Sequence, residues 1–187
     1  MRNIEFSNFT FILFAIIVLL ILYVFIKGKV KGEKLIYIAL FVIYLIFLIN
    51  ITIFPITVIK TNDTRNIFDN YFKQKAYYQF IPFKTILNVG NYNFFRQVIC
   101  NILLFMPLSF FIKIIFNKLS AIKIILIGIF SSLIIELLQL LINLITNFPS
   151  YVCDIDDLIL NSIGVVIGYM ISLLFLKLKN IKKEGIK

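Results

Sequence analysis

The residues best suited to chemistry are polar side chains that stand inside long apolar runs. Glu136 lies in a stretch, residues 124–142, that contains 14 Ile, Leu and Phe side chains. Gln139 and Asn143 follow it at positions i+3 and i+7, so a helix would carry all three as one polar stripe. The apolar residues favour membrane insertion by about 4–8 kcal/mol, against a cost of roughly 2.5–3.5 kcal/mol for a central carboxylate. The stripe is therefore expected to face the interior of a helix bundle.

Three acids and two carboxamides stand near the ends of neighbouring apolar runs. Asp154, Asp156 and Asp157 fall within four residues, and no Lys or Arg lies near them. Such a cluster suits a divalent cation that holds a pyrophosphate, or a general acid kept protonated by lipid and by other acids. Asn101 and Asn161 add hydrogen-bond donors and acceptors in two other runs. Binding or catalysis would depend on these carboxylates and carboxamides.

The absence of histidine excludes several kinds of chemistry. With no His in 187 residues, the chain lacks the usual base of a catalytic triad, an imidazole proton shuttle and the commonest zinc ligand. Cys100 and Cys153 are too few for a disulfide framework or a metal knuckle, although one bridge between them is open. We expect no resident cofactor; the weaker alternative is the divalent cation held by Glu136 and the three aspartates.

The composition places the protein in a membrane. Hydrophobic residues make up 61% of the chain and charged residues 15%, and the mean hydropathy is +1.00. A soluble domain of this composition would lack the polar residues needed to cover its surface, so the apolar excess must face lipid. The net charge of +10 is concentrated at the ends of apolar runs, where anionic headgroups account for it. Membrane lipids are thus the expected partners, and nucleic acid is not.

Five apolar runs are long enough, or nearly so, to cross about 30 Å of hydrocarbon as helices. They are residues 9–26, 35–54, 98–116, 122–145 and 158–178. The first run is too long for a secretory signal and has no small-residue cleavage site after it, so we expect it to stay as a helix. The prediction is a single all-α membrane domain, residues 1–187, built as a polytopic bundle of about five transmembrane helices.

The orientation follows from the distribution of Lys and Arg. Twelve of the 19 fall in segment 27–34, around the turn near residue 118, and in the tail from residue 177. The remaining seven fall near the N-terminus and in the connection 55–97. The positive-inside rule then predicts an outside N-terminus, a cytoplasmic C-terminus and an extracytoplasmic connection 55–97. Aromatic residues of that connection are expected at the headgroups: Tyr71, Tyr77, Tyr78, Phe80 and Phe83.

The polar residues of the separate spans are predicted to lie at one depth. At about 1.5 Å per residue, Glu136 stands roughly 21 Å from the cytoplasmic end of its helix. Asn50, Asn101 and Asn161 likewise fall near the outer ends of their spans. We therefore predict an outward-opening polar pocket. Its expected residues are Arg96, Gln97, Asn101, Glu136, Gln139, Asp154, Asp156, Asp157 and Asn161.

Purely structural roles are open for several of these residues. Asp156 and Asp157 suit the start of the last helix, because acids stabilise a helix N-terminus by about 0.3–1 kcal/mol. Asn101 and Asn161 suit interhelical hydrogen bonds worth about 0.6 kcal/mol each. Glu136 suits a structural pairing with Arg96 or with a helix amide.

Two further features of the spans point to helix geometry. Pro107 lies in the middle of its run, where it predicts a kink that frees carbonyls toward the pocket. Gly164 and Gly168 stand four residues apart in the last run, a spacing typical of close helix packing.

Three ordered motifs resemble the VanZ-like family of bacterial membrane proteins. They are NILLFMPLS at 101–109, SLIIELLQ at 132–139 and DIDDLILNSIGVVIGY at 154–169, and FIPF at 80–83 also resembles the family's segment before its third span. The resemblance covers about residues 35–178. One position differs: the family has Arg three residues before the first Asp, where this chain has Tyr151. The cation that would pair with the acids is therefore missing unless Arg96 replaces it.

The resemblance implies a role in the Gram-positive cell envelope, since the family's namesake is associated with low-level resistance to teicoplanin and related lipoglycopeptides. The resemblance therefore suggests where the protein acts and does not identify a reaction that it catalyses. Our leading hypothesis is a multi-pass protein of the cell membrane, without established catalysis, whose pocket binds an amphipathic molecule. A lipid-linked cell-wall precursor or the acyl tail of a lipoglycopeptide would fit.

Two other functions remain open. One is a metal-assisted enzyme that acts on a lipid-linked substrate through Glu136 and the aspartates. The other is proton-coupled transport through Glu136, which is less favoured because the cytoplasmic halves of the runs lack polar groups.

Overall fold

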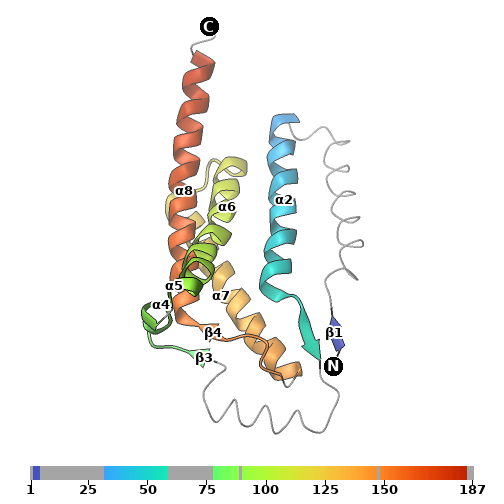
Figure 1. Cartoon of the computed structure of the whole chain (residues 1–187). Coiled ribbons are helices and arrows are strands. Elements are labelled where there is room, and N and C mark those ends of the chain that lie inside the picture. Colours follow the sequence, from blue (N-terminus) through green and yellow to red (C-terminus); the bar gives the residue numbers. More distant parts are fainter. Residues whose placement is uncertain (1, 5–31, 59–77, 89, 147, 185–187) are drawn as a thin grey trace.

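Four long helices dominate the structure, a computed structural model that describes residues 2–4, 32–58, 78–88, 90–146 and 148–184 (Figure 1). The long helices are α2 (Gly32–Ile53), α6 (Cys100–Ile115), α7 (Ala121–Thr146) and α8 (Ile155–Glu184). The shorter elements are β1 (Arg2–Ile4), β2 (Ile56–Val58), β3 (Tyr78–Gln79), α4 (Lys84–Asn88), α5 (Asn91–Phe94), a π-helical turn η1 (Phe95–Ile99) and β4 (Cys153–Asp154).

The long helices, with α6 taken together with η1, have the length and hydropathy of membrane spans. The candidate spans are Gly32–Ile53, Phe95–Ile115, Ala121–Thr146 and Ile155–Ile181. This confirms an all-α, multi-pass membrane bundle and four of the five predicted spans. The fifth predicted run, residues 9–26, lies outside the described residues. The helices extend past the predicted runs at most ends, because backbone hydrogen bonding continues into the interface where hydropathy has already fallen.

The connection 55–97 is more structured than the sequence suggested. Its described part contains β2, β3, α4, α5 and the start of η1, and η1 continues directly into α6. Two short strand pairs were also not predicted. β1 pairs antiparallel with β2, and β3 pairs parallel with β4, which joins the segment before α6 to the segment before α8. Strands of two or three residues are too short for alternation of apolar and polar residues to reveal them.

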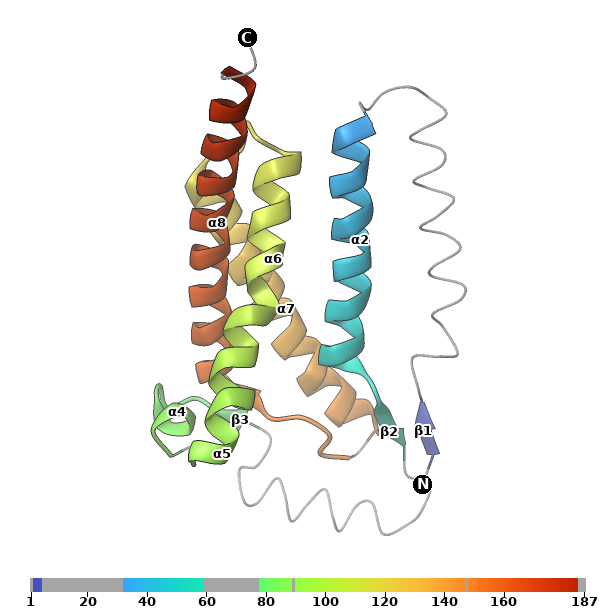
Figure 2. The ribbon, with the colours of Figure 1, turned by 45° about the horizontal axis from the view of Figure 1, so that its top comes forward.

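α6 packs between α8 and α2, and α7 crosses behind these helices and contacts all three (Figure 2). α6 and α8 share the most extensive contact. A Cβ on Gly164 would overlap the backbone carbonyl of Ile102, and one on Gly168 would overlap that of Met106. Glycine at these two positions therefore lets the two backbones approach closely. The Ser109 hydroxyl uses this proximity to donate to the Val165 carbonyl at 2.6 Å.

A compact apolar core lies where α2, α6, α7 and α8 meet. Its buried residues include Tyr44, Leu48, Phe105, Ile124 and Val165. The Tyr44 hydroxyl donates to the Leu104 carbonyl at 2.8 Å. Pro107 follows within α6 and, having no N–H, cannot donate to the carbonyl four residues before it. The Tyr44 hydroxyl thus adds a hydrogen-bond donor close to the turn of α6 in which Pro107 removes a backbone hydrogen bond.

The two ends of the bundle differ in their charged residues. The start of α2, the α6–α7 turn and the end of α8 lie at one end, and the start of α8 with β3, β4 and α4 lies at the other (Figure 1). At the first end Lys179 pairs with Glu33 at 2.7 Å, and Lys113 donates to the carbonyls of Asn117 and Leu119. Asp156 and Asp157, in the first turn of α8, lie at the second end (Figure 1). Which end faces the cytoplasm stays a prediction from the positive-inside rule.

Candidate functional site

The acidic end of α8 is built by a cap that its own sequence supplies. Asp154 immediately precedes the helix, and its Oδ1 accepts the Asp156 N–H at 2.9 Å, as an N-cap aspartate does. Its Oδ2 accepts the Thr85 hydroxyl at 2.6 Å, and its own N–H donates to Glu136 Oε2 at 3.2 Å. Asp154 therefore joins α8 to both α4 and α7. The sequence left helix initiation open as a role of Asp156 and Asp157. Both stand in the first turn of α8, and the capping oxygen comes from Asp154.

Asp156 caps a different helix. It is fully buried and accepts three backbone N–H groups at the start of α4, from Phe83 at 2.5 Å, Thr85 at 2.8 Å and Ile86 at 3.1 Å. The α4 segment has no side-chain oxygen of its own at the N-cap, where Phe83 stands with φ 65°. A bulky residue in the left-handed region is strained, and the carboxylate holds it there. We call Asp154, Asp156 and the N-terminal turn of α4 the clamp.

Cys153 lies beside the clamp, with its side chain buried. Burial raises the pKa of its thiol to about 11, and the nearby carboxyl groups of Glu136, Asp154 and Asp157 act in the same direction. The thiol also hydrogen-bonds to Glu136. Because burial and the surrounding acids both raise the pKa of the thiol, Cys153 stays protonated at neutral pH and is a poor nucleophile. Cys100 is exposed, and both cysteines are free thiols.

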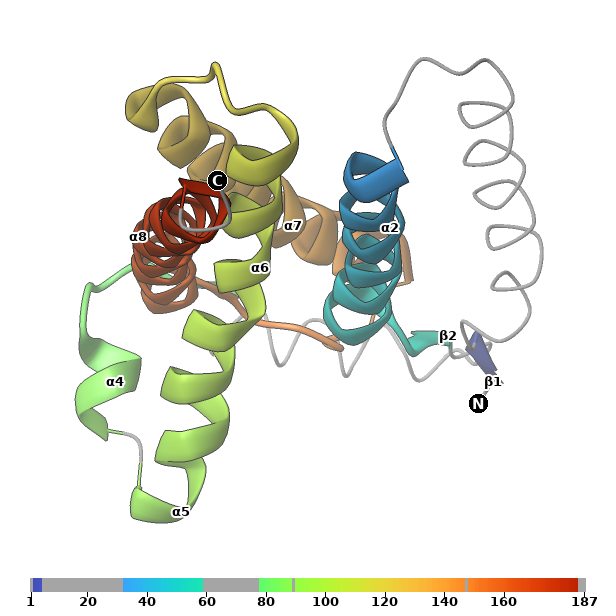
Figure 3. The same cartoon turned by 90° about the horizontal axis from the view of Figure 1, so that it is seen from above.

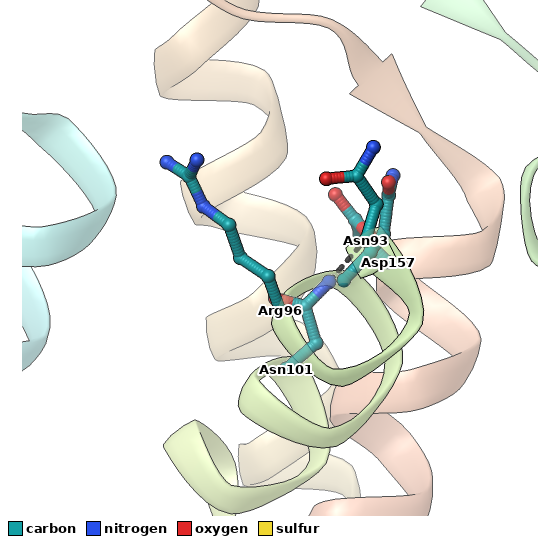
Figure 4. Close-up of a pocket in the computed structure, with 5 residues that line it drawn as sticks. Asn93, Arg96, Asn101 and Asp157 are labelled. Atoms are coloured by element: carbon teal, nitrogen blue, oxygen red, sulfur yellow. Dashed lines mark hydrogen bonds between the residues drawn. The ribbon is translucent and has the colours of Figure 1, made fainter. Parts of the chain in front are cut away.

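Asp157 faces an open polar cavity of about 390 Å³. Its lining residues are Asn93, Arg96, Gln97, Asn101 and Asp157, and we call it the polar pocket (Figure 4). Asn101 Nδ2 donates to Asp157 Oδ1 at 2.5 Å, which orients the carboxylate. Three carboxamides, one carboxylate and one guanidinium thus line a single cavity. Such a set offers donors and acceptors in several directions and suits a headgroup rich in hydroxyl, amide or phosphate groups.

Arg96 does not replace the cation that the family places before the aspartates. Its guanidinium points away from Asp157 and Asn101 (Figure 4), and no ion pair joins it to an acid within the described ranges. It is exposed and stands at the rim of the polar pocket. Arg96 is therefore available to an anionic group that approaches from outside.

Tyr151, at the position of the missing cation, is directed toward α2. Its hydroxyl donates to the Ile53 carbonyl at 2.5 Å, with the Pro55 carbonyl at 3.2 Å. Burial raises the pKa of the phenol, so it remains a donor. A donor at a helix C-terminus satisfies carbonyls that have no partner within the helix. The Tyr151 hydroxyl thus stabilises the C-terminal end of α2, and its hydrogen bonds go to backbone carbonyls and not to the aspartates.

The remaining predicted site residues hold the helices together. Gln139 donates to the Thr52 carbonyl at 2.8 Å and joins α7 to α2, away from the polar pocket. Asn161 donates to Ser132 Oγ at 2.8 Å, while its Oδ1 is buried and has no donor among the described residues. Glu136 is buried beside Asp154 and Cys153. Of the nine predicted pocket residues, the cavity collects Arg96, Gln97, Asn101 and Asp157.

Two residues of this region carry no signal in the sequence, and a third has a role that only the structure shows. Asn93 lines the polar pocket, and Thr85 bonds to Asp154; both stand in a segment without periodicity or motif, so no signal marked them. Asn143 was identified in the polar stripe but not given a role. It is fully buried, donates to the Tyr151 carbonyl, and accepts the N–H groups of Ser150 and Tyr151. It therefore shapes the loop that leads into the clamp.

The carboxylate oxygens of Asp154 and Asp156 are already hydrogen-bonded within the protein. Within the described ranges, no group of three or more His, Cys, Asp or Glu side chains is placed to hold a metal ion. The carboxylate oxygens of Asp154 and Asp156 instead accept hydrogen bonds from α4 and from the α8 backbone.

Comparison with known proteins identifies a family. A family model described as VanZ/LLP1 matches residues 41–176, which is more than half of the chain. The matched residues include those of the polar pocket, the clamp and the contact between α6 and α8. Comparisons with curated proteins and with solved structures gave no match.

Proposed function

Because the chain belongs to the VanZ/LLP1 family, we propose that it acts in the bacterial cell envelope by binding the headgroup of an amphipathic envelope molecule in the polar pocket. The family resemblance suggests the context, low-level resistance to teicoplanin and related lipoglycopeptides in Gram-positive bacteria. The bound molecule would be a lipid-linked cell-wall precursor or the lipoglycopeptide itself.

The observation that carries this proposal is the polar pocket at the end of an otherwise apolar bundle. Asn93, Gln97 and Asn101 offer amide donors and acceptors, Asp157 offers a carboxylate, and Arg96 stands exposed at the rim. Polar groups are costly among spans unless they pair or serve a ligand. The clamp acids are paired, whereas the polar pocket keeps an open cavity of about 390 Å³.

Apolar surfaces near the polar pocket suit the hydrophobic part of the same ligand. Phe94 and Phe95 are exposed beside Arg96. An acyl or prenyl chain in the leaflet would meet these surfaces while its headgroup reached the polar pocket.

Lipid co-purification tests the binding. The protein would be extracted from a Gram-positive membrane in mild detergent or nanodiscs, and the retained lipids would be identified by mass spectrometry. We expect one class with a sugar or phosphate headgroup to be enriched on the parent protein and reduced in Gln97→Ala and Asn101→Ala. Gln139→Ala is the matched control, because it removes a carboxamide outside the polar pocket. Equal lipid profiles for all of these variants would refute the proposal.

A susceptibility assay tests the context. Expression in a teicoplanin-sensitive Gram-positive host should raise tolerance to lipoglycopeptides more than tolerance to a glycopeptide without an acyl tail. Asn101→Ala should remove the increase at equal expression. If tolerance is unchanged while the lipid still co-purifies, the pocket binds an envelope lipid but has no part in resistance.

A further inference from the structure

An exposed apolar surface surrounds the segment that precedes α6. Residues 78–99, comprising β3, α4, α5 and η1, form what we call the interfacial hairpin. Its large hydrophobic side chains that are more than half exposed are Phe80, Ile81, Phe83, Leu87 and Phe95. Leu87 reaches 80% exposure, the largest value among the exposed large hydrophobic residues of the described chain. An apolar surface of this kind requires an occupant.

The position of the interfacial hairpin identifies that occupant. Viewed along the bundle, α4 and α5 project sideways beyond the footprint of the long helices (Figure 3). They stand at the level where α8 begins (Figure 1). Because the spans cross the bilayer along the bundle axis, a segment that projects sideways at the end of a span lies at the boundary of headgroups and acyl chains.

The charge of the interfacial hairpin agrees with this position. Residues 78–99 contain Lys84 and Arg96 and no Asp or Glu. Both cations are exposed. Phosphate groups of anionic lipids lie just outside the acyl region and attract such residues. Tyr78 and Phe80 stack with ring centroids 5.1 Å apart, so the two rings form one aromatic surface.

The clamp fixes the interfacial hairpin to the bundle. Asp156 binds three backbone N–H groups at the start of α4, Thr85 binds Asp154, and β3 pairs with β4. These contacts join the hairpin to α8 at its polar side and leave its apolar side chains outward. The depth of a free amphipathic segment in the membrane depends on that segment alone. The depth of the interfacial hairpin is instead fixed by its contacts with α8.

We propose that the interfacial hairpin is a membrane-interface anchor, which inserts Phe80, Leu87 and Phe95 into the leaflet at the acidic end of the bundle while Lys84 and Arg96 contact anionic headgroups. The proposal does not depend on the ligand of the polar pocket. It places the rim of that pocket at the headgroup boundary, so that access is lateral from the leaflet.

Tryptophan fluorescence tests this anchor directly, because the chain contains no Trp. Phe80→Trp, Leu87→Trp and Phe95→Trp would each be reconstituted as the full chain in vesicles of phosphatidylcholine and phosphatidylglycerol, with bromine at a shallow, middle or deep acyl position. We expect strongest quenching by the shallow bromine, corresponding to about 5–10 Å below the headgroups. Phe130→Trp, 58% exposed within α7, is the control that deep bromine should quench.

The outcomes distinguish the possibilities. Quenching by aqueous iodide and by none of the brominated lipids would overturn the proposal, as would strongest quenching by deep bromine. Lys84→Gln should weaken shallow quenching more in vesicles rich in phosphatidylglycerol than in phosphatidylcholine alone. If a Trp variant is poorly folded, nitroxide labels at the same positions, in a background without native cysteines, report accessibility to oxygen and to an aqueous nickel complex.

Discussion

Asp156 and Asp157 are neighbours in the first turn of α8, yet they belong to regions with opposite properties. Asp156 is fully buried, and both of its oxygens accept backbone N–H groups of α4. Asp157 is partly exposed, bonds to Asn101 through one oxygen and faces the polar pocket. A rotation of about 100° along the helix is enough to separate a structural carboxylate from one that is available to a ligand.

The difference teaches how to divide an acidic cluster within a membrane protein. An intramembrane acid is a functional candidate by default, but an acid whose oxygens are already used by backbone donors has little capacity left for a ligand. In this molecule the clamp acids organise the interfacial hairpin, and the polar pocket keeps free hydrogen-bonding capacity.

Removing the charge of Asp156 should have the largest effect. Asp156→Asn replaces one acceptor oxygen with an NH₂ group that faces backbone N–H groups of α4, and each buried donor left unpaired costs about 1–3 kcal/mol. We expect the free energy of unfolding to fall by about 2–4 kcal/mol, measured by thermal unfolding in one fixed detergent. An unchanged melting temperature would mean that the clamp does not hold α4.

The rate at which the Cys153 thiol is alkylated reports whether the clamp beside it is intact. The pKa of its thiol lies at about 11 in the folded protein against 9.0 as the reference value, so the thiolate fraction near pH 8 is about 100-fold smaller. In a Cys100→Ser background, iodoacetamide should label Cys153 of the folded protein at least about 100-fold more slowly than it labels the unfolded chain. Asp156→Asn should accelerate it, and equal rates for folded and unfolded protein would contradict the buried position.

The same thiol predicts a pH dependence of stability. Its pKa is raised in the folded state, so the unfolded chain releases the proton first as the pH rises. The stabilisation is therefore fully present below pH 9 and is lost between pH 9 and about 11. Cys153→Ala should remove this part of the alkaline loss, as followed by unfolding at a series of pH values.

Removing the charge of Asp157 should affect binding and spare stability. Asp157→Asn keeps an oxygen for the Asn101 contact, so we expect the unfolding free energy to change by less than about 1 kcal/mol. Retention of the co-purifying lipid should fall by about 10-fold, which corresponds to about 1.4 kcal/mol. A loss of stability as large as that of Asp156→Asn would remove the distinction between the two regions.

The smallest effect is expected at Tyr151. Tyr151→Phe removes the hydroxyl that donates to the end of α2 and should cost about 1 kcal/mol of unfolding free energy. Lipid retention should be unchanged, because the side chain does not line the polar pocket. A loss of lipid binding in this variant would show that the two regions are coupled through the loop before β4.

Individual residues show which parts of the site were predictable. Asn101 and Asp157 belong to separate motifs, and their common depth predicted their proximity. Gln139 has the same depth, but its direction around α7 places it against Thr52 instead of the polar pocket. Hydropathy determines depth and carries no information about rotation, so residues at one level were assigned to one site. Thr85 and Asn93 lie outside the spans, where depth gives no constraint at all.

The spans and the membrane location follow from composition and run length alone, because lipid admits few backbone structures and about 20 apolar residues are enough to cross it. The family follows from three motifs with their order and spacing. Which carboxylate is used by the backbone and which faces a cavity depends on contacts between residues about 70 positions apart, such as Phe83 and Asp156. Such contacts depend on how helices pack and rotate against one another, and only the folded arrangement reveals them.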